Sequence, residues 1–183
     1  MAGPDPATQS RRVRAAKRVT GSLTLACWVA ASGAAMEIIF DWSNTMQDLF
    51  HNITVAAAIP PISVADNTAQ VSNIIDRRGY ESLTFAIATG SLADADATFT
   101  VLVEDGDTAN LSDAAAVADA DLLGTEAAAS FTFAADNAAR KIGYVGAKRY
   151  VRLTITPAAN ASAALIGALA ILGHPANAPT TNP

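Results

Sequence analysis

Two runs of alternating apolar residues between Gly79 and Val103 constrain the fold of this chain more than any other stretch. Every second residue of each run is large and apolar: Leu83, Phe85 and Ile87 in the first, and Phe99, Val101 and Val103 in the second. A period of two, with aromatic and β-branched residues on one side, is typical of strands that bury one face. The connector 90–96 is rich in Gly and Asp, which favours a hairpin loop between the two strands.

Short strand-like runs continue from Ala69 onward, separated by turn residues. The further predicted strands are 70–76, 121–125, 130–134, 141–145, 149–156 and 162–172. Pro157 is expected to end the strand 149–156, and the Ala-rich segment 113–120 is the one piece that suits a helical turn. Segment 162–172 is apolar throughout, so its pattern fits helix or strand, and its length favours a buried strand. The sequence predicts an all-β protein with a single β-sandwich or jelly-roll-like domain of about seven to nine strands.

The region before these strands has no clean period. A short amphipathic helix is one reading of its apolar residues, which have helical spacing at Trp42, Met46, Leu49 and Phe50. Asn52–Ala58 is predicted to be a strand that Pro60 and Pro61 stop, because a double proline favours an extended linker. We place the domain boundary between residues 46 and 62. The predicted parts are an irregular N-terminal extension (1–45), the sandwich domain (46–175) and a C-terminal tail (176–183).

Residues 1–35 differ in composition from the rest of the chain. They carry five basic side chains and then an apolar run, Leu23–Ala35, that ends in small residues. This order is typical of an export signal, and the run is short for a membrane anchor, which needs about 20 residues. A third reading is a disordered arm, or a start that truly lies at Met36 or Met46.

Charge separates the two parts further. Residues 1–35 have a net charge of +4, whereas residues 36–183 carry seven basic and sixteen acidic side chains, a net charge of −9. An acidic body argues against nucleic-acid binding by the folded domain, because phosphate affinity needs clustered Lys and Arg. Only 16% of the residues are charged, below the usual quarter, and a neutral surface of Ala, Thr and Ser suits packing against other protein subunits.

No pattern in the sequence predicts catalysis or a cofactor. Cys27 is the single cysteine, so neither an intrachain disulfide nor a multi-cysteine metal site is possible. His51 and His174 are far apart in sequence, and no G-x-S-x-G motif accompanies them. Small acidic clusters at loop positions leave a structural calcium ion open, although turn chemistry explains these residues without an ion. They lie at 94–96, 104–107 and 119–121.

Two basic dipeptides, Arg77-Arg78 and Lys148-Arg149, are candidate subunit contacts. One interpretation is charges at strand edges or turns, which discourage edge-to-edge aggregation. The other is a pair of contacts to an acidic neighbouring subunit. Trp42 and Phe50 are further candidates for such contacts.

Several segments, as a set, resemble small virion-associated proteins of tailed bacteriophages and prophages. The segments that carry the resemblance are Asp48–Ile53, Ile75–Ser82, Phe85–Gly90, Phe99–Asp107, Asp121–Thr125, Ile142–Leu153 and Gly173–Pro175. They spread over about two thirds of the chain, and the first 45 residues have no counterpart in many such proteins. Proteins of this kind tend to be encoded among head and head–tail joining genes, so the resemblance implies a structural role in the particle.

The resemblance implies a non-enzymatic capsid decoration, or cement, protein that is located in the virion. Its expected partners are the major capsid protein and copies of itself, in a homo-oligomer or a symmetric array, with no cofactor, nucleic acid or membrane. A neck or tail accessory role is a close variant. A different class of function is a secreted carbohydrate-binding β-sandwich, exported by residues 1–35. Its candidate sugar-stacking aromatics are Trp42, Tyr80, Tyr144 and Tyr150.

Overall fold

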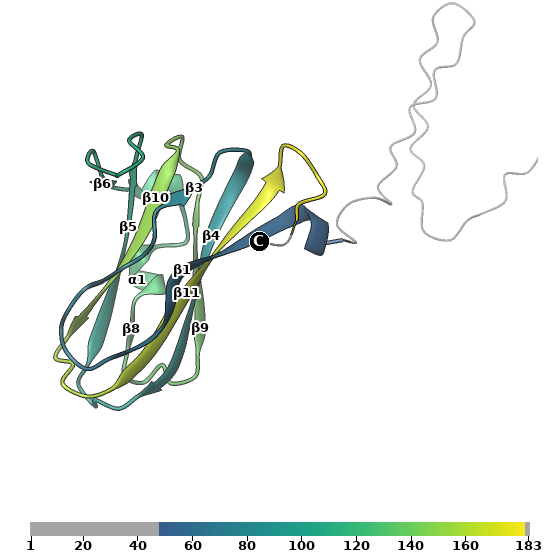
Figure 1. The fold of residues 1–183 in the computed structure, drawn as a ribbon. Coiled ribbons are helices and arrows are strands. Elements are labelled where there is room, and N and C mark those ends of the chain that lie inside the picture. The colour runs from purple at the N-terminus through teal and green to yellow at the C-terminus, as the bar shows by residue number, and fades with distance from the viewer. Residues whose placement is uncertain (1–47, 182–183) are drawn as a thin grey trace, which may run out of the picture. The chain divides into compact units, whose positions relative to one another are not determined.

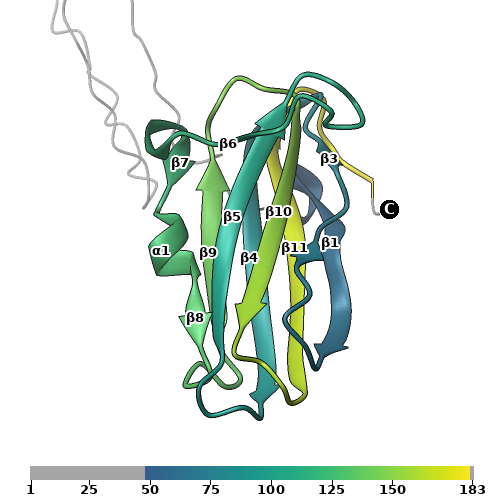
Figure 2. The same ribbon diagram turned by 90° about the vertical axis from the view of Figure 1, so that its left-hand side faces the viewer.

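Eleven strands form two antiparallel sheets that face each other in the computed structural model, which describes residues 48–181 (Figures 1 and 2). The strands are β1 (Ile53–Val64), β2 (Gln70–Val71), β3 (Ile75–Asp76), β4 (Tyr80–Leu92), β5 (Thr98–Gly106), β6 (Ala115–Ala116), β7 (Leu122–Leu123), β8 (Phe131–Thr132), β9 (Ala139–Tyr144), β10 (Tyr150–Ala158) and β11 (Ala164–Pro175). Three short helices accompany them: η1 (Phe50–Asn52), η2 (Asp119–Asp121) and α1 (Glu126–Ala129).

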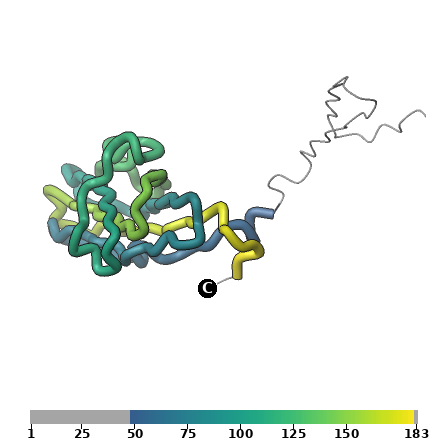
Figure 3. Tube along the Cα trace, turned by 90° about the horizontal axis from the view of Figure 1, so that it is seen from above, coloured from purple at the N-terminus to yellow at the C-terminus, as the bar shows by residue number. Residues whose placement is uncertain are grey.

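The first sheet has the strand order β1-β11-β4-β9-β7, and the second has β2-β10-β5-β6, with β3 also paired to β10 and β8 to β5. The first and last long strands, β1 and β11, lie side by side in the first sheet (Figure 3). The all-β class and the two-sheet, sandwich-like arrangement are thus confirmed. The predicted extension 1–45, including Trp42, lies outside the described residues.

The core lies between the two sheets and is built by the alternation seen in the sequence. Alternate residues of β4, β5 and β10 are at most 1% exposed: Leu83, Phe85, Ile87, Phe99, Val101, Val103, Val151, Leu153 and Ile155. The ring of Phe99 stacks on that of Phe131, with centroids 4.7 Å apart. Each fully buried large side chain of this kind stabilises the fold by about 1.5–3 kcal/mol.

The predicted hairpin between the two central strands is wrong. β4 pairs with β11 and β9 in the first sheet, whereas β5 pairs with β10, β6 and β8 in the second. The connector therefore passes from one sheet to the other. Alternation reveals which face of a strand is buried and not which strand is its neighbour, and both strands bury their apolar faces in the same core.

The predicted stop at Pro60 and Pro61 is also wrong, because β1 continues through both prolines to Val64. β1 is an edge strand that pairs only with β11, and its register shifts between Ala57 and Ile59 and again before Ile62. Proline is tolerated at such edge and bulge positions, since no ladder hydrogen bond needs its missing N–H.

Of three further predictions, two are wrong and one is confirmed. β10 continues past Pro157, which pairs with Phe99, so the predicted end there is wrong. The predicted helical turn at 113–120 is wrong over most of its length, because this segment contains β6 and only the start of η2. Segment 162–172 forms most of β11, so the preferred strand reading is confirmed.

Candidate interaction surface

The outer surface of the first sheet is apolar and almost free of charge. Cross-strand register places one row of outward residues across all five strands: Val55, Ile171, Thr84, Gly143 and Leu123. We define the apolar face as the outward residues Val55, Ala57, Ser63, Leu165, Gly167, Leu169, Ile171, Thr84, Ala86, Ala88, Gly90, Ala139, Lys141, Gly143 and Leu123. Lys141 is the only charged residue in this set.

Large side chains on this face are open to solvent. Leu165 is 47% exposed, Leu169 46% and Leu123 62%. Single exposed apolar residues are normal on a protein surface, but a contiguous apolar patch marks an interaction site. The strand β11 explains this patch, because both of its faces are apolar and only one of them faces the core.

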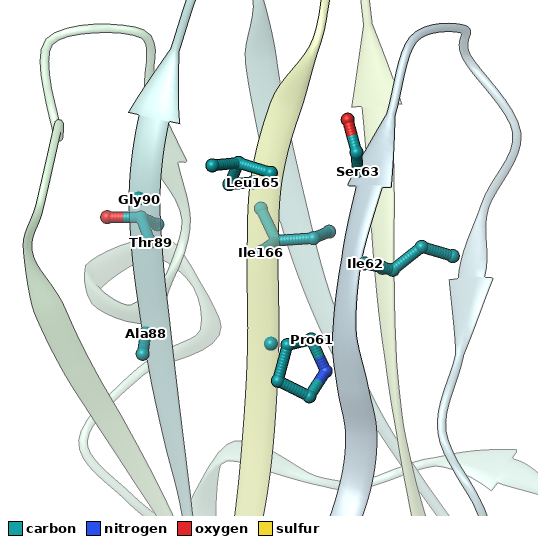
Figure 4. Close-up of a pocket in the computed structure, with 9 residues that line it drawn as sticks. Pro61, Ile62, Ser63, Ala88, Thr89, Gly90, Leu165 and Ile166 are labelled. Carbon is teal, nitrogen blue, oxygen red and sulfur yellow. The ribbon is translucent and has the colours of Figure 1, made fainter.

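The relief of the apolar face comes from two neighbouring strands. β11 presents Leu165, Leu169 and Ile171 as a ridge, and the facing positions of β4 carry small residues, among them Ala86 and Gly90. Gly90 is required there, because a Cβ at this position would lie 2.9 Å from the Cβ of Leu165. Figure 4 shows Leu165 and Ile166 between the strands that carry Gly90 and Ser63.

A groove of about 340 Å³ opens at one end of the apolar face. Its walls come from β1, β11 and β4, and the residues that line it are Pro61, Ile62, Ser63, Ala88, Thr89, Gly90, Leu165, Ile166 and Gly167 (Figure 4). No charged group lines the groove, so it suits an aliphatic side chain better than a polar ligand.

The outer surface of the second sheet has the opposite character. Its outward positions include Thr98, Thr100, Thr154 and Thr156. Arg152 and Glu104 form an ion pair across β10 and β5, with Nε 2.8 Å from Oε2 and Nη2 3.2 Å from Oε1. Hydrogen bonding by Arg152 lowers the pKa of Glu104. A broad apolar surface thus lies on one side of the sandwich, and a polar one on the other.

Parts of the sheet edges are occupied by groups of the chain itself. Beside β5, α1 and the residue that follows it supply two acceptors: the N–H of Val103 donates to Glu126 Oε1 (2.7 Å) and that of Val101 to Ser130 Oγ (2.9 Å). Beside β1, the N–H of Asn73 donates to the carbonyl of Ala58 (2.9 Å). Stretches of edge that are occupied in this way do not template another strand.

The predicted basic residues come together at one end of the sandwich, which we name the basic corner (Arg77, Arg78, Lys148 and Arg149). The N–H of Arg77 donates to the carbonyl of Arg149 (3.1 Å). Arg149 forms a two-point ion pair with Asp76, with Nε–Oδ1 at 2.9 Å and Nη2–Oδ2 at 2.6 Å. This hydrogen bonding lowers the pKa of Asp76 from 3.8 to about 2.

Two more members of the basic corner also have partners within the chain. Lys148 forms an ion pair with Asp107. The guanidinium of Arg77 donates to the carbonyl of Gly146 and lies 5.2 Å from the ring centroid of Tyr144. Arg78 is exposed and forms no ion pair with any residue between 48 and 181. Of the four charges in the basic corner, that of Arg78 is therefore the most available to another subunit.

Phe50, the other predicted contact within the described chain, lies in η1 and is 65% exposed. Its ring meets that of His51 edge to face, with centroids 5.1 Å apart. The three tyrosines do not form an exposed aromatic platform. Tyr144 is 1% exposed, the hydroxyl of Tyr80 is bonded to Thr54 Oγ1 (2.7 Å), and the ring of Tyr150 lies 4.8 Å from the guanidinium carbon of Arg149.

Both histidines have local partners. His51 contacts Asp48, and Nδ1 of His174 lies 3.0 Å from Ser82 Oγ. No carboxylate of the described chain hydrogen bonds to His174, so the Ser82–His174 pair lacks the third member of a catalytic triad. Within residues 48–181 no group of three or more metal-binding side chains is close enough to hold an ion. None of the helices described there has the length and apolarity to cross a membrane.

Neither protein-family models nor curated protein sequences give a match to this chain. The apolar face was not predicted as a site from the sequence. The available signal was the combination of a fully apolar run at 162–172 with small residues on alternate positions of 84–90. Its meaning depends on the two strands being neighbours in one sheet, which the alternation does not reveal.

Proposed function

We propose that this chain is a non-enzymatic structural protein of a tailed-phage virion and acts as a capsid decoration protein. The observation that carries the proposal is the apolar face, a broad and nearly uncharged sheet surface that is exposed in the single chain. An exposed apolar surface of this size marks a site that other protein subunits cover. The protein is therefore best suited to work within an assembly.

The kind of assembly is inferred from the resemblance to phage virion proteins. Two of the resembling segments, 75–82 and 142–153, supply both sides of the basic corner, where Asp76 pairs with Arg149 and Arg77 with Tyr144. The corner is thus built from two of the segments on which the resemblance rests. This supports the structural role that the resemblance implies. The position of the protein in the particle is decided by the experiment below.

In the proposed mechanism, copies of the sandwich pack across the joints between major capsid subunits. Each copy would bury on the order of 800 Å² per partner, the usual size of a specific interface. Arg78 and Phe50 are the proposed contacts to the capsid, because both are exposed and Arg78 has no ion-pair partner among the described residues. Many symmetric copies would add their small contributions into a stiffer shell.

The test is the composition of purified phage-like particles from a culture that produces this chain. Quantitative mass spectrometry is expected to find the chain in the particles at a copy number near that of the major capsid protein. A few copies per particle would favour the neck or tail variant instead. Absence from the particles, together with a secreted form cut near Ala35, would contradict the proposal and favour the carbohydrate-binding alternative.

A further inference from the structure

The apolar face has a self-complementary relief. In the register between β11 and β4, Leu169 lies beside Ala86, and Ile171 lies beside Thr84. Leu165 lies across Gly90 in the same way, since its Cβ is the nearest neighbour of that glycine. A ridge of large aliphatic side chains, interrupted at Gly167, thus runs alongside a strip of small ones.

We propose that the apolar face pairs with the same face of a second copy of this chain, forming a twofold-symmetric dimer. The twofold axis runs along the strands, between β11 and β4. This axis places the ridge of each copy on the small residues of the other, so that Leu169 meets the partner copy at Ala86. Such an interface is isologous, because each contact occurs twice, and stacked sheets pack about 10 Å apart in this way.

The size of the apolar face sets the strength expected of such a dimer. The proposed axis places four strands of each copy (β1, β11, β4 and β9) opposite strands of the other. Their spacing of about 4.8 Å, and about 20 Å of strand length from Leu165 to Ile171, give roughly 400 Å² of sheet area per copy. Specific stable interfaces begin at about 600 Å² per partner. The dimer is therefore expected to be weak and transient, with a dissociation constant that ordinary protein concentrations can span.

Charge directs a second copy to this face rather than to the rest of the surface. Residues 48–183 carry seven basic and fourteen acidic side chains, a net charge of −7, so two copies repel each other over most of their surfaces. The apolar face has only Lys141, in the same cross-strand row as Ala86, Leu169 and Ala57. The proposed axis places Lys141 opposite the partner's Ala57, so the two lysines do not meet. A different protein would be selected through charged and polar groups, and this face offers few.

Sedimentation velocity of the purified full chain tests the proposal, over concentrations from about 1 to about 100 µM. The wild-type chain is expected to pass from monomer to dimer in this range. Leu169→Lys places a charge at the centre of the interface and is expected to weaken the dimer more than tenfold. Leu169 is 46% exposed, so the circular dichroism spectrum and melting temperature of the variant should stay close to wild type.

Two further variants separate a specific dimer from general stickiness. Val71→Lys is the matched control, because Val71 is 55% exposed on the other sheet, and its dimer should equal that of wild type. Ala86→Leu makes the face more apolar but removes the space for the partner's Leu169. Non-specific association would strengthen in Ala86→Leu, whereas the proposed dimer is expected to weaken.

A wild-type chain that stays monomeric throughout, a dimer that survives Leu169→Lys, or a stronger association of Ala86→Leu would each overturn the proposal. The experiment uses purified chain without particles. Both proposals start from the apolar face, but their tests are separate: a dimer in solution of a chain that is absent from virions would contradict only the proposed function.

Discussion

The carboxylate of Asp76 joins β3 to Arg149 at the start of β10, and its lowered pKa makes this contact sensitive to pH. An acid whose pKa falls from 3.8 to about 2 on folding stabilises the folded state above about pH 4. That contribution is lost as the pH falls through 2. The side chains of Arg149 and Asp76 are 41% and 39% exposed, so solvent screening limits the contribution to about 1 kcal/mol.

We predict that Asp76→Asn lowers the free energy of unfolding by about 1 kcal/mol at pH 7. The difference from wild type should shrink as the pH falls from about 4 towards 2, because Asp76 is then protonated in the unfolded chain and, near its pKa of about 2, half protonated in the folded chain. Urea unfolding at several pH values measures this difference. Asp119→Asn is the control, since no ion pair involves Asp119 in the described chain. A constant loss at all pH values would contradict the ion-pair explanation.

Tyr144 is a buried residue whose hydroxyl connects the end of β5 to the loop before β10. The hydroxyl donates to Asp105 Oδ2 (2.7 Å) and accepts from the N–H of Lys148 (3.0 Å). Burial, followed by the hydrogen bond to Asp105, raises its pKa. We predict that Tyr144→Phe destabilises the fold by about 1–2 kcal/mol, because it leaves the N–H of Lys148 without its partner. Thermal unfolding measures the loss, and Tyr150→Phe, at a half-buried site, should cost less.

At the scale of elements, α1 acts as a cover for the edge of β5. We predict that Glu126→Ala costs about 1–2 kcal/mol, because it removes the acceptor of the Val103 N–H. Hydrogen exchange at the amide of Val103 should then become faster than at the amide of Leu153, in the core of β10. Glu126→Gln keeps an oxygen acceptor, so it should restore slow exchange. Equally slow exchange in Glu126→Ala would show that α1 does not protect this edge.

The strands themselves could be predicted from alternation, whereas their partners could not. Segments 83–89, 97–103 and 149–156 are strands as predicted, because a buried face requires apolar residues at every second position. The hairpin and the stop at Pro60 were predicted wrongly for one reason. Strand pairing and edge position are properties of the whole sheet. Pairing decides whether a Gly/Asp connector turns back into a hairpin or crosses to the other sheet. Edge position decides whether a strand tolerates a proline.

The candidate interaction surface, too, could be predicted only in part from the sequence. The basic dipeptides stood out in the sequence, but the structure gives Arg77, Lys148 and Arg149 partners within the chain, and leaves Arg78 exposed. The apolar face was missed, because Leu165 and Leu169 look like core residues in a fully apolar run. Their exposure follows from the absence of a covering layer on the outer side of β11 in the described chain.

For the molecule as a whole, the described core lies entirely within residues 53–175, and the described residues 48–181 belong to one compact unit. We predict that a chain starting at Asp48 folds by itself. Its melting temperature should lie within about 3 °C of the full chain, which corresponds to about 1 kcal/mol for a domain of this size. A matched chain starting at Val64 lacks β1, and it should not give a cooperative transition. Loss of folding in the chain that starts at Asp48 would contradict the predicted independence.

The sequence by itself determined the all-β class, the inward faces of the long strands and the lack of an obvious catalytic motif. Each of these depends on local residue order, since alternation follows from the two-residue period of a strand. Only the tertiary structure decided which strands pair, how the edges are covered and which apolar face stays in water. These depend on contacts between residues far apart in the chain, such as Leu169 with Ala86, and their partners cannot be read from spacing along the sequence.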